Sequence, residues 1–263
     1  MAQTTEEMQN KGETSVAGPS MDAISMITLL ADILRLPEEC LAMSFVFLNR
    51  YQKFQRQQKS SLGLDNHMLA LACLSVASKA KDAPRRVREF LRPAWRLMHQ
   101  APDSAALECP SPAYDSLRST LVRNELILLR ILKFELRVST PFDFLPGYLT
   151  EAMRDFGVND GGADALVYFD DRSKEDKEAD RIADLMETGI AKDCRAKALG
   201  ACKDYQLANF FPAKAVTAAC IYIVLRDRGL LPGIDMKRWL RDKVSRSIEL
   251  EDFEDAVSSM DKR

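Results

Sequence analysis

Residues 64–79 read LDNHMLALACLSVASK, and residues 211–226 read FPAKAVTAACIYIVLR. Aligned without gaps, the two stretches pair like residues at several positions: Ala72-Cys73 with Ala219-Cys220, Val76 with Ile223, and Lys79 with Arg226. Self-similarity at one long period predicts two copies of one structural unit. Each copy has small residues at its centre and larger apolar residues around them, which suits a helix packed closely against other helices.

A second echo lies downstream of each copy. Residues 87–91 read VREFL and residues 236–240 read MKRWL. Apolar residues recur at helical spacing through most of the chain, and strand signals are almost absent. We therefore expect an all-α fold of two consecutive five-helix bundles, formed by residues 21–138 and 139–263.

The helix boundaries follow from capping signals. In the first half, Pro37 and Pro84 each open a helix, Asp65 caps the helix that reaches about residue 81, and a long helix covers residues 113–134. In the second half, Thr140 and Pro141 open a helix that reaches about residue 156. Further helices are expected from about residue 182 past Leu199, over 211–227, around Trp239, and over 249–260. Gly189 and Gly200 are weak points in the first of these.

Two segments do not read as helices. Residues 1–20 are rich in Thr, Gln, Glu, Ser and Gly, so we expect a flexible tail. Residues 157–176 are first glycine-rich and then acidic, which is typical of an exposed insertion.

Composition limits the function classes. The 263 residues are 46% hydrophobic and 29% charged, with a net charge of −2. This balance argues against a protein that mainly coats nucleic acid or an anionic membrane, although a local basic stripe stays open. No apolar run is long enough to span a bilayer, and the acidic N-terminus is not a signal peptide, so no membrane partner is expected. The six cysteines form no CxxC pair and are expected to be free thiols, which leaves no metal site.

Glu125 is the first position with unusual chemistry. It lies at the edge of the apolar stripe of its helix, four residues after Leu121 and three before Leu128. A carboxylate there needs a partner or borders an interface, because an unpaired buried charge costs several kcal/mol. Lys79 is the expected partner. The alternative is that Glu125 tilts into water and Lys79 only complements the dipole of its own helix.

Three segments carry a resemblance to a known family. Residues 36–42 (LPEECLA), 74–79 (LSVASK) and 123–136 (RNELILLRILKFEL) resemble the cyclin family, whose fold is two five-helix repeats. The resemblance covers about residues 21–263 and is weakest over residues 157–205. It implies that Lys79 and Glu125 bind the backbone of a cyclin-dependent kinase near its mobile αC helix. It further implies a kinase-binding surface that includes Val76, Leu129, Phe134 and Leu136.

The chain also departs from the family pattern. Many relatives carry an aromatic residue or valine after the lysine and then two acids, whereas this chain reads Ala80-Lys81-Asp82. Ala80 therefore reduces the bulk of the kinase-binding pocket. The substrate-docking patch of the cell-cycle cyclins lacks its arginine in the comparable stretch, residues 21–26. The basic run over residues 82–89 is similar to that of the transcription-type cyclins, which favours that branch.

The resemblance implies a regulatory subunit and not an enzyme. A cyclin holds the kinase αC helix inward, and the kinase supplies the phosphoryl-transfer residues. No catalytic residue, cofactor or metal is therefore expected in this chain. The transcription-type branch implies substrates in the RNA polymerase II machinery and a nuclear location, with the cytoplasm as a second location. The kinase, its substrates and the need for a further regulatory subunit stay open.

Three other function classes compete. A transcription initiation factor with cyclin-like repeats grips DNA, but near-neutral charge and the lack of a zinc ribbon count against it, so we do not expect direct nucleic-acid binding. A helical terpene-type synthase binds magnesium diphosphate through acidic clusters. The acidic run over residues 170–176 imitates one such cluster, but no second cluster is evident. The third class is a helical scaffold that binds no kinase.

Overall fold

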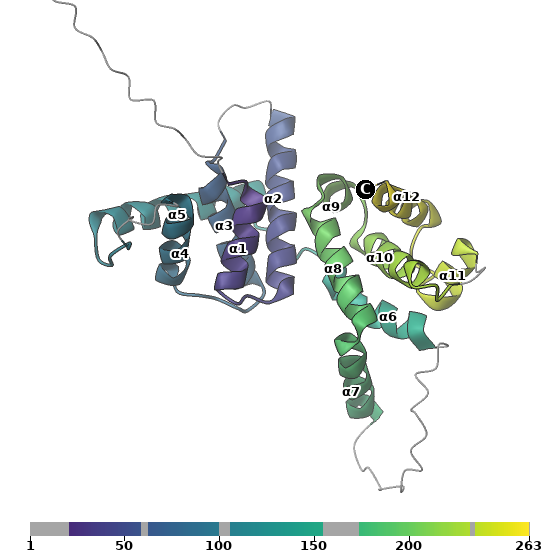
Figure 1. Ribbon diagram of the computed structural model, residues 1–263. Coiled ribbons are helices and arrows are strands. Elements are labelled where there is room, and N and C mark those ends of the chain that lie inside the picture. The colour runs from purple at the N-terminus through teal and green to yellow at the C-terminus, as the bar shows by residue number, and fades with distance from the viewer. Residues whose placement is uncertain (1–20, 59–62, 100–105, 155–173, 232–234, 263) are drawn as a thin grey trace, which may run out of the picture.

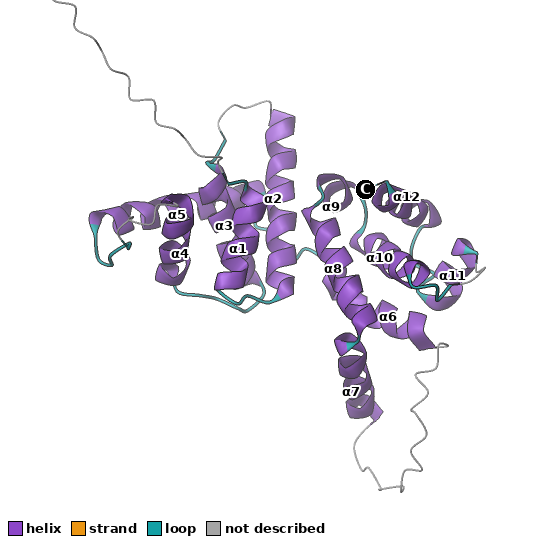
Figure 2. Cartoon of the chain, in the orientation of Figure 1, coloured by secondary structure: helices purple, strands orange, loops and turns teal. Residues whose placement is uncertain are grey.

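The structure, a computed structural model, describes residues 21–58, 63–99, 106–154, 174–231 and 235–262. Every regular element within these ranges is a helix, which confirms the all-α prediction (Figure 2). No helix in the described ranges is both long and apolar enough to cross a membrane. The tail predicted at residues 1–20 and most of the insertion predicted at 157–176 lie outside the described residues, and the last three residues of that insertion begin a helix.

The first bundle is built around its third helix. Its five helices are α1 (Ala23–Ile33), α2 (Glu38–Gln58), α3 (Asn66–Ala80), α4 (Val87–His99) and α5 (Pro112–Ile131). The central helix α3 packs against the other four, and every one of its residues from Met68 to Ser78 is buried. A helix that is buried all round needs small side chains for close approach, which explains the Ala-rich centre of the sequence repeat.

The second bundle repeats this arrangement. Its elements are the 3₁₀ turn η1 (Pro141–Asp143) and helices α6 (Leu145–Met153), α7 (Lys174–Glu187), α8 (Gly189–Lys203), α9 (Tyr205–Phe210), α10 (Ala213–Asp227), α11 (Met236–Lys243) and α12 (Leu250–Asp261). Helix α10 packs against α6, α8 and α12, as α3 packs against α1, α2 and α5. Helix α11 contacts α6 just as α4 contacts α1. The five repeated helices are therefore present in the same order, and α7 and α9 are additions.

The start of the second bundle differs from the prediction of one helix running from Thr140 to about Phe156. The Asp143 carboxylate accepts hydrogen bonds from the Thr140 amide (2.7 Å) and hydroxyl (3.0 Å), and this closes a single 3₁₀ turn. Pro146 has no N–H to donate, so it fits only the first turn of a helix. The α-helix accordingly begins at Leu145 and ends at Met153.

Two other helix ends follow from local chemistry. Helix α5 ends at Ile131, before the predicted end at Phe134, because Lys133 and Phe134 adopt left-handed backbone angles with φ of 54° and 58°. The weak point predicted at Gly189 is a real break between α7 and α8. There the Thr188 hydroxyl accepts a hydrogen bond from the Ala191 amide and begins a new helix.

The two bundles pack against one another. Figure 1 shows α2 lying beside α8 and α9, and the contacts between these helices agree with that view. The hydrophobic core of the first bundle continues into the second through Ala198, Ala201, Cys202, Leu207, Val216 and Cys220. At this junction the buried Asn49 side chain donates a hydrogen bond to the Cys202 carbonyl (2.9 Å), and Asn209 donates to the Asn49 carbonyl (3.2 Å).

Candidate kinase-binding site

The structure brings Lys79 and Glu125 together. Lys79 lies in the last turn of α3, and its Nζ is 2.8 Å from each carboxylate oxygen of Glu125 on α5. One helical turn earlier, the buried Ser75 donates a hydrogen bond of 2.5 Å from its Oγ to Glu125 Oε1. The predicted pairing is confirmed, and the alternative in which Glu125 tilts into water is wrong, because only 14% of its side chain is exposed.

The pair lies at the boundary between core and solvent. The Lys79 side chain is 51% exposed, whereas the carboxylate of Glu125 accepts a hydrogen bond from Ser75 on the side of the core. Because Lys79 is half exposed, solvent screens its attraction to Glu125 and reduces what the pair contributes to fold stability. Two of the three N–H groups of the ammonium donate to Glu125, which leaves one available for a partner.

An exposed apolar face runs along α5 beside Glu125. Val122 and Leu126 expose 45% and 48% of their surfaces, and the half-buried Leu129 follows at the same helical spacing. Val122 and Leu126 were not among the residues predicted from the sequence. Their spacing of four and three residues up to Leu129 is the signal that identifies them as one face.

The other predicted site residues differ in their exposure. Val76 is 3% exposed and belongs to the core of the first bundle, so little of it is available to a partner. Ala80 and Leu136 line one shallow hollow of about 270 Å³ after the end of α3. Phe134 is 65% exposed, because the left-handed turn after α5 directs it away from the core.

The second bundle contains a counterpart of the ion pair. Arg226, which aligns with Lys79, lies near the end of α10 and donates two hydrogen bonds of 2.8 Å to Asp261 on α12. These hydrogen bonds hold the pKa of Asp261 below its ordinary value. Within the described ranges, however, the exposed large apolar side chains lie on α1, α2, α5, α9 and at Phe134, and none lies on α10 or α12. The apolar face thus accompanies only the first ion pair.

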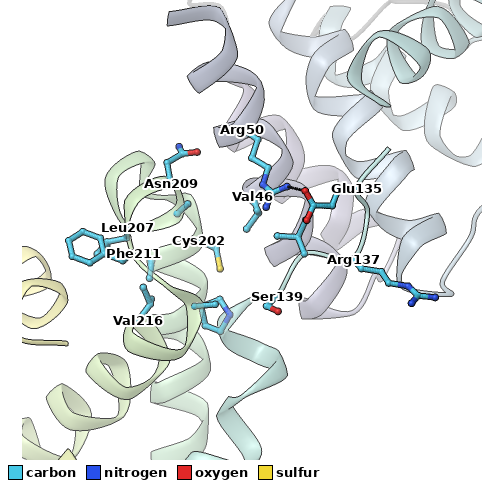
Figure 3. A pocket seen from close by; sticks show the side chains of 15 residues that line it. Val46, Arg50, Glu135, Arg137, Ser139, Cys202, Leu207, Asn209, Phe211 and Val216 are labelled. Atoms are coloured by element: carbon cyan, nitrogen blue, oxygen red, sulfur yellow. Dashed lines mark ion pairs between the residues drawn. The ribbon is translucent and has the colours of Figure 1, made fainter. Parts of the chain in front are cut away.

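A second hollow of about 380 Å³ lies between the bundles (Figure 3). Arg50 pairs with Glu135 at 3.6 Å on one side of it, and Arg137 points away from it. Cys202 also lines it, but burial raises the pKa of this thiol to about 12, so the thiol is protonated and a poor nucleophile at neutral pH. All six cysteines are free thiols, as predicted. Among the described residues, no group of three or more His, Cys, Asp or Glu side chains is placed to hold a metal ion.

Comparisons with known proteins identify the family of this chain. The family model described as cyclin, N-terminal domain, matches residues 6–137, just over half of the chain. Cyclin-T1-3 of Oryza sativa subsp. japonica is 26% identical over 139 residues, which are 51% of this chain and 26% of that protein. Cyclin-L1 of Xenopus laevis is 28% identical over 122 residues, which are 44% of this chain and 23% of that protein. The chain spans about a quarter of the length of these relatives.

Two solved structures share the fold. A chain of the yeast RNA polymerase II CTD kinase CTDK-1 complex matches with a TM-score of 0.58 and 13% identity, over 90% of this chain and 62% of that chain. A chain of the yeast TFIIK (Kin28/Ccl1/Tfb3) complex matches with a TM-score of 0.52 and 17% identity, over 90% and 83%. Two repeated helical bundles, a family model over the first bundle and relatives among the T and L cyclins lead to one conclusion. The chain belongs to the cyclin family, whose members are non-catalytic regulatory subunits of kinases.

Proposed function

We propose that this chain binds and activates a cyclin-dependent Ser/Thr kinase through the surface formed by α3 and α5. The observation that carries the proposal is the Lys79–Glu125 pair, supported by Ser75, at the edge of the exposed apolar face of α5. This combination suits an amphipathic helix of a partner. Val122, Leu126 and Phe134 provide apolar area, and the charged pair provides directional hydrogen bonds.

The proposed mechanism is a shift between two kinase conformers. The Lys79 ammonium donates to backbone carbonyls next to the kinase αC helix, and the Glu125 carboxylate accepts from backbone amides. The apolar face then packs on the helix itself. Because a partner that binds both conformers equally shifts nothing, this surface has to bind the inward αC position more tightly than the outward one. The phosphoryl-transfer residues belong to the kinase.

The proposed process is RNA polymerase II transcription, which would place the chain in the nucleus. The relatives among the T and L cyclins and the fold shared with chains of CTDK-1 and TFIIK support this choice. We further propose that residues 21–138 and 139–263 are the two cyclin boxes. The TFIIK complex has three named components, so a third subunit beside cyclin and kinase is part of the proposal.

The test is charge reversal at the proposed site. The full chain is purified from its own cells, and the bound kinase is identified by mass spectrometry. Lys79→Glu and Glu125→Lys should each weaken binding of that kinase by about thirtyfold or more, equivalent to ~2 kcal/mol, because each change makes an interface contact repulsive. Binding is measured by titration of the purified kinase, and folding by circular dichroism.

The second bundle provides the matched control. Arg226→Glu and Asp261→Lys break the repeat-related ion pair, which lacks the apolar face, so both variants should bind the kinase like the unchanged chain. Folded Lys79→Glu and Glu125→Lys variants that still bind the kinase normally would rule out the proposed site. Equal losses in all four variants would mean that the ion pairs act through folding.

A further inference from the structure

Helix α4 has one strongly basic face. Arg88, Arg92 and Arg96 follow one another at intervals of four residues, and all three are exposed. They lie opposite the side of the helix that buries Phe90 and Leu91 in the core. At a rise of ~1.5 Å per residue, the Cα atoms of neighbouring arginines in this row lie about 6 Å apart along the helix axis.

The charge of this face is not compensated within the described part of the chain. No ion pair among the described residues includes Arg88, Arg92 or Arg96, and Glu89 instead accepts a hydrogen bond from the Arg86 amide at the start of the helix. Like charges four residues apart destabilise a helix by about 0.2–0.5 kcal/mol per pair. The row of arginines therefore does not serve the stability of α4, and its charge is available to an anionic partner.

An aromatic pair lies on the same face. The rings of Trp95 and His99 contact each other with their centroids 3.8 Å apart, and His99 Nδ1 lies 2.9 Å from the Trp95 carbonyl oxygen. His99 is exposed and Trp95 is half-buried. The helical positions of 95 and 99 fall next to those of 88, 92 and 96, so the cations and the flat rings form one surface.

The repeat-related helix α11 of the second bundle has no such surface. There Arg238 lies 3.5 Å from Asp242, so part of the charge is compensated. The aromatic residue of α11, Trp239, is 1% exposed and stacks inside the core against Phe253. Helix α11 is cationic in sequence but offers no aromatic surface beside its cations.

We propose that the exposed face of α4 (Arg88, Arg92, Trp95, Arg96 and His99) binds single-stranded RNA. Successive phosphates are neutralised by the three arginines, and an unpaired base stacks on the Trp95–His99 pair. Proteins that bind single strands combine cations along the phosphate backbone with aromatic rings on which the bases stack. A phosphorylated peptide uses the cations but has no base to place on the rings, and a duplex keeps its bases stacked internally.

This inference revises the sequence-based expectation of no direct nucleic-acid binding. That expectation rested on the net charge of −2 for the whole chain and on the lack of a zinc ribbon. The local balance is different, since residues 85–96 contain five arginines and one glutamate. The proposed RNA-binding face is made by α4, apart from the α3 and α5 positions of the proposed kinase site, and does not depend on that function.

The test uses the full chain and a fluorescein-labelled 12-nucleotide poly(U) RNA, with binding followed by fluorescence anisotropy at several salt concentrations. The triple variant Arg88→Gln, Arg92→Gln, Arg96→Gln should lose about tenfold or more in affinity at low salt. Its plot of log K against log salt should be shallower by about 2, since each neutralised phosphate contributes about 0.7 to the slope for single strands. Trp95→Leu, which keeps an apolar group against the core, should lose about fivefold with an unchanged slope.

Two further variants keep the result interpretable. Arg238→Gln with Arg241→Gln on α11 removes two exposed cations from the repeat-related helix and should leave RNA binding unchanged. The single change Arg92→Gln should reduce the slope by about 0.7 and gives a measurement even where the triple variant folds poorly. Circular dichroism checks the folding of every variant.

Three outcomes would overturn the proposal. The first is an unchanged chain that binds the RNA no better than the α4 triple variant. The second is tighter binding of a 12-base-pair duplex than of the single strand. The third is binding of a phosphoserine peptide of equal charge while the RNA does not bind, which would assign the face to an acidic protein partner.

Discussion

Ser75 shows how one hydroxyl sets the position of the proposed kinase-binding charge. It is buried, and its Oγ donates a hydrogen bond of 2.5 Å to Glu125 Oε1. Lys79 contacts both carboxylate oxygens from the solvent side. Without the hydroxyl, the carboxylate has one fixed partner on a flexible, half-exposed lysine. Ser75 therefore acts as a positioning residue, through Glu125.

Ser75→Ala should leave the chain folded, lower its stability by about 1 kcal/mol, and weaken kinase binding by about threefold to tenfold. Ser78→Ala is the matched control, because the buried Ser78 hydroxyl donates only to the Ser75 carbonyl and does not contact Glu125. It should lower stability to a similar extent and leave kinase binding unchanged. Titration with the purified kinase and urea unfolding separate the two effects, and equal binding losses in both variants would contradict a positioning role for Ser75.

The sequence predicted the pairing of Lys79 with Glu125, beside the alternative of a solvated Glu125, but it did not predict the surroundings of the pair. A carboxylate at the edge of an apolar stripe needs a partner, and Lys79 was a candidate because it lies at the end of its helix, just beyond the apolar face. Ser75 gave no such signal, because a serine inside an Ala-rich helix is as easily explained by close packing. Its contact is with Glu125, which lies 50 residues later in the chain, and it depends on how α3 is rotated against α5.

At the scale of elements, Asp143 joins the end of α3 to the start of the second bundle. Its carboxylate closes the η1 turn through Thr140, and Lys81 donates a hydrogen bond of 2.9 Å to its other oxygen. Partial burial acts to raise the pKa of Asp143, but the Thr140 amide and the Lys81 ammonium outweigh it and hold the pKa below the ordinary value of 3.8.

This shift predicts a pH-dependent contribution to stability. A depressed folded-state pKa stabilises the fold above the unfolded-state value of 3.8, and the contribution is lost as the pH falls through the lower folded-state value. Asp143→Asn should therefore be less stable than the unchanged chain at pH 7, and the difference should shrink below pH ~4. Urea unfolding of both chains at pH 7 and pH 3 measures it. A stability difference that is constant with pH would contradict the prediction.

Helix boundaries were predictable where a side chain caps the backbone. Asp65 accepts hydrogen bonds from the His67 and Met68 amides, as its position before an apolar run indicates. The end of α5 was not predictable in this way, because Lys133 and Phe134 are not residues that favour left-handed angles. Their conformation follows from the tertiary path that turns the chain toward α2 and the second bundle.

At the scale of the whole molecule, the repeat predicted two bundles but not how they meet. Their junction is an extension of the first core together with the buried Asn49, which binds a carbonyl 153 residues away. Periodicity within one helix reports which side is buried, and it carries no information about which distant helix covers that side. The polar junction therefore had to come from the structure.

Asn49→Ala should lower the free energy of unfolding by about 1–3 kcal/mol, because it leaves the buried Cys202 carbonyl without its donor. Gln57→Ala on the exposed side of the same helix is the control and should change stability by less than about 0.5 kcal/mol. Urea unfolding followed by circular dichroism and by tryptophan fluorescence measures both. An unchanged midpoint for Asn49→Ala would mean that the junction contributes little to the fold.

The exposed apolar face of α5 and the nearby Phe134 also bear on how long the chain survives in a cell without its kinase. Leu126 and Phe134 stand in water for as long as the chain is alone, and such side chains are what chaperones and degradation systems recognise on orphan subunits. Under the proposed function, a bound kinase hides them. We therefore expect that chain produced without its kinase aggregates or is degraded faster than chain in the complex.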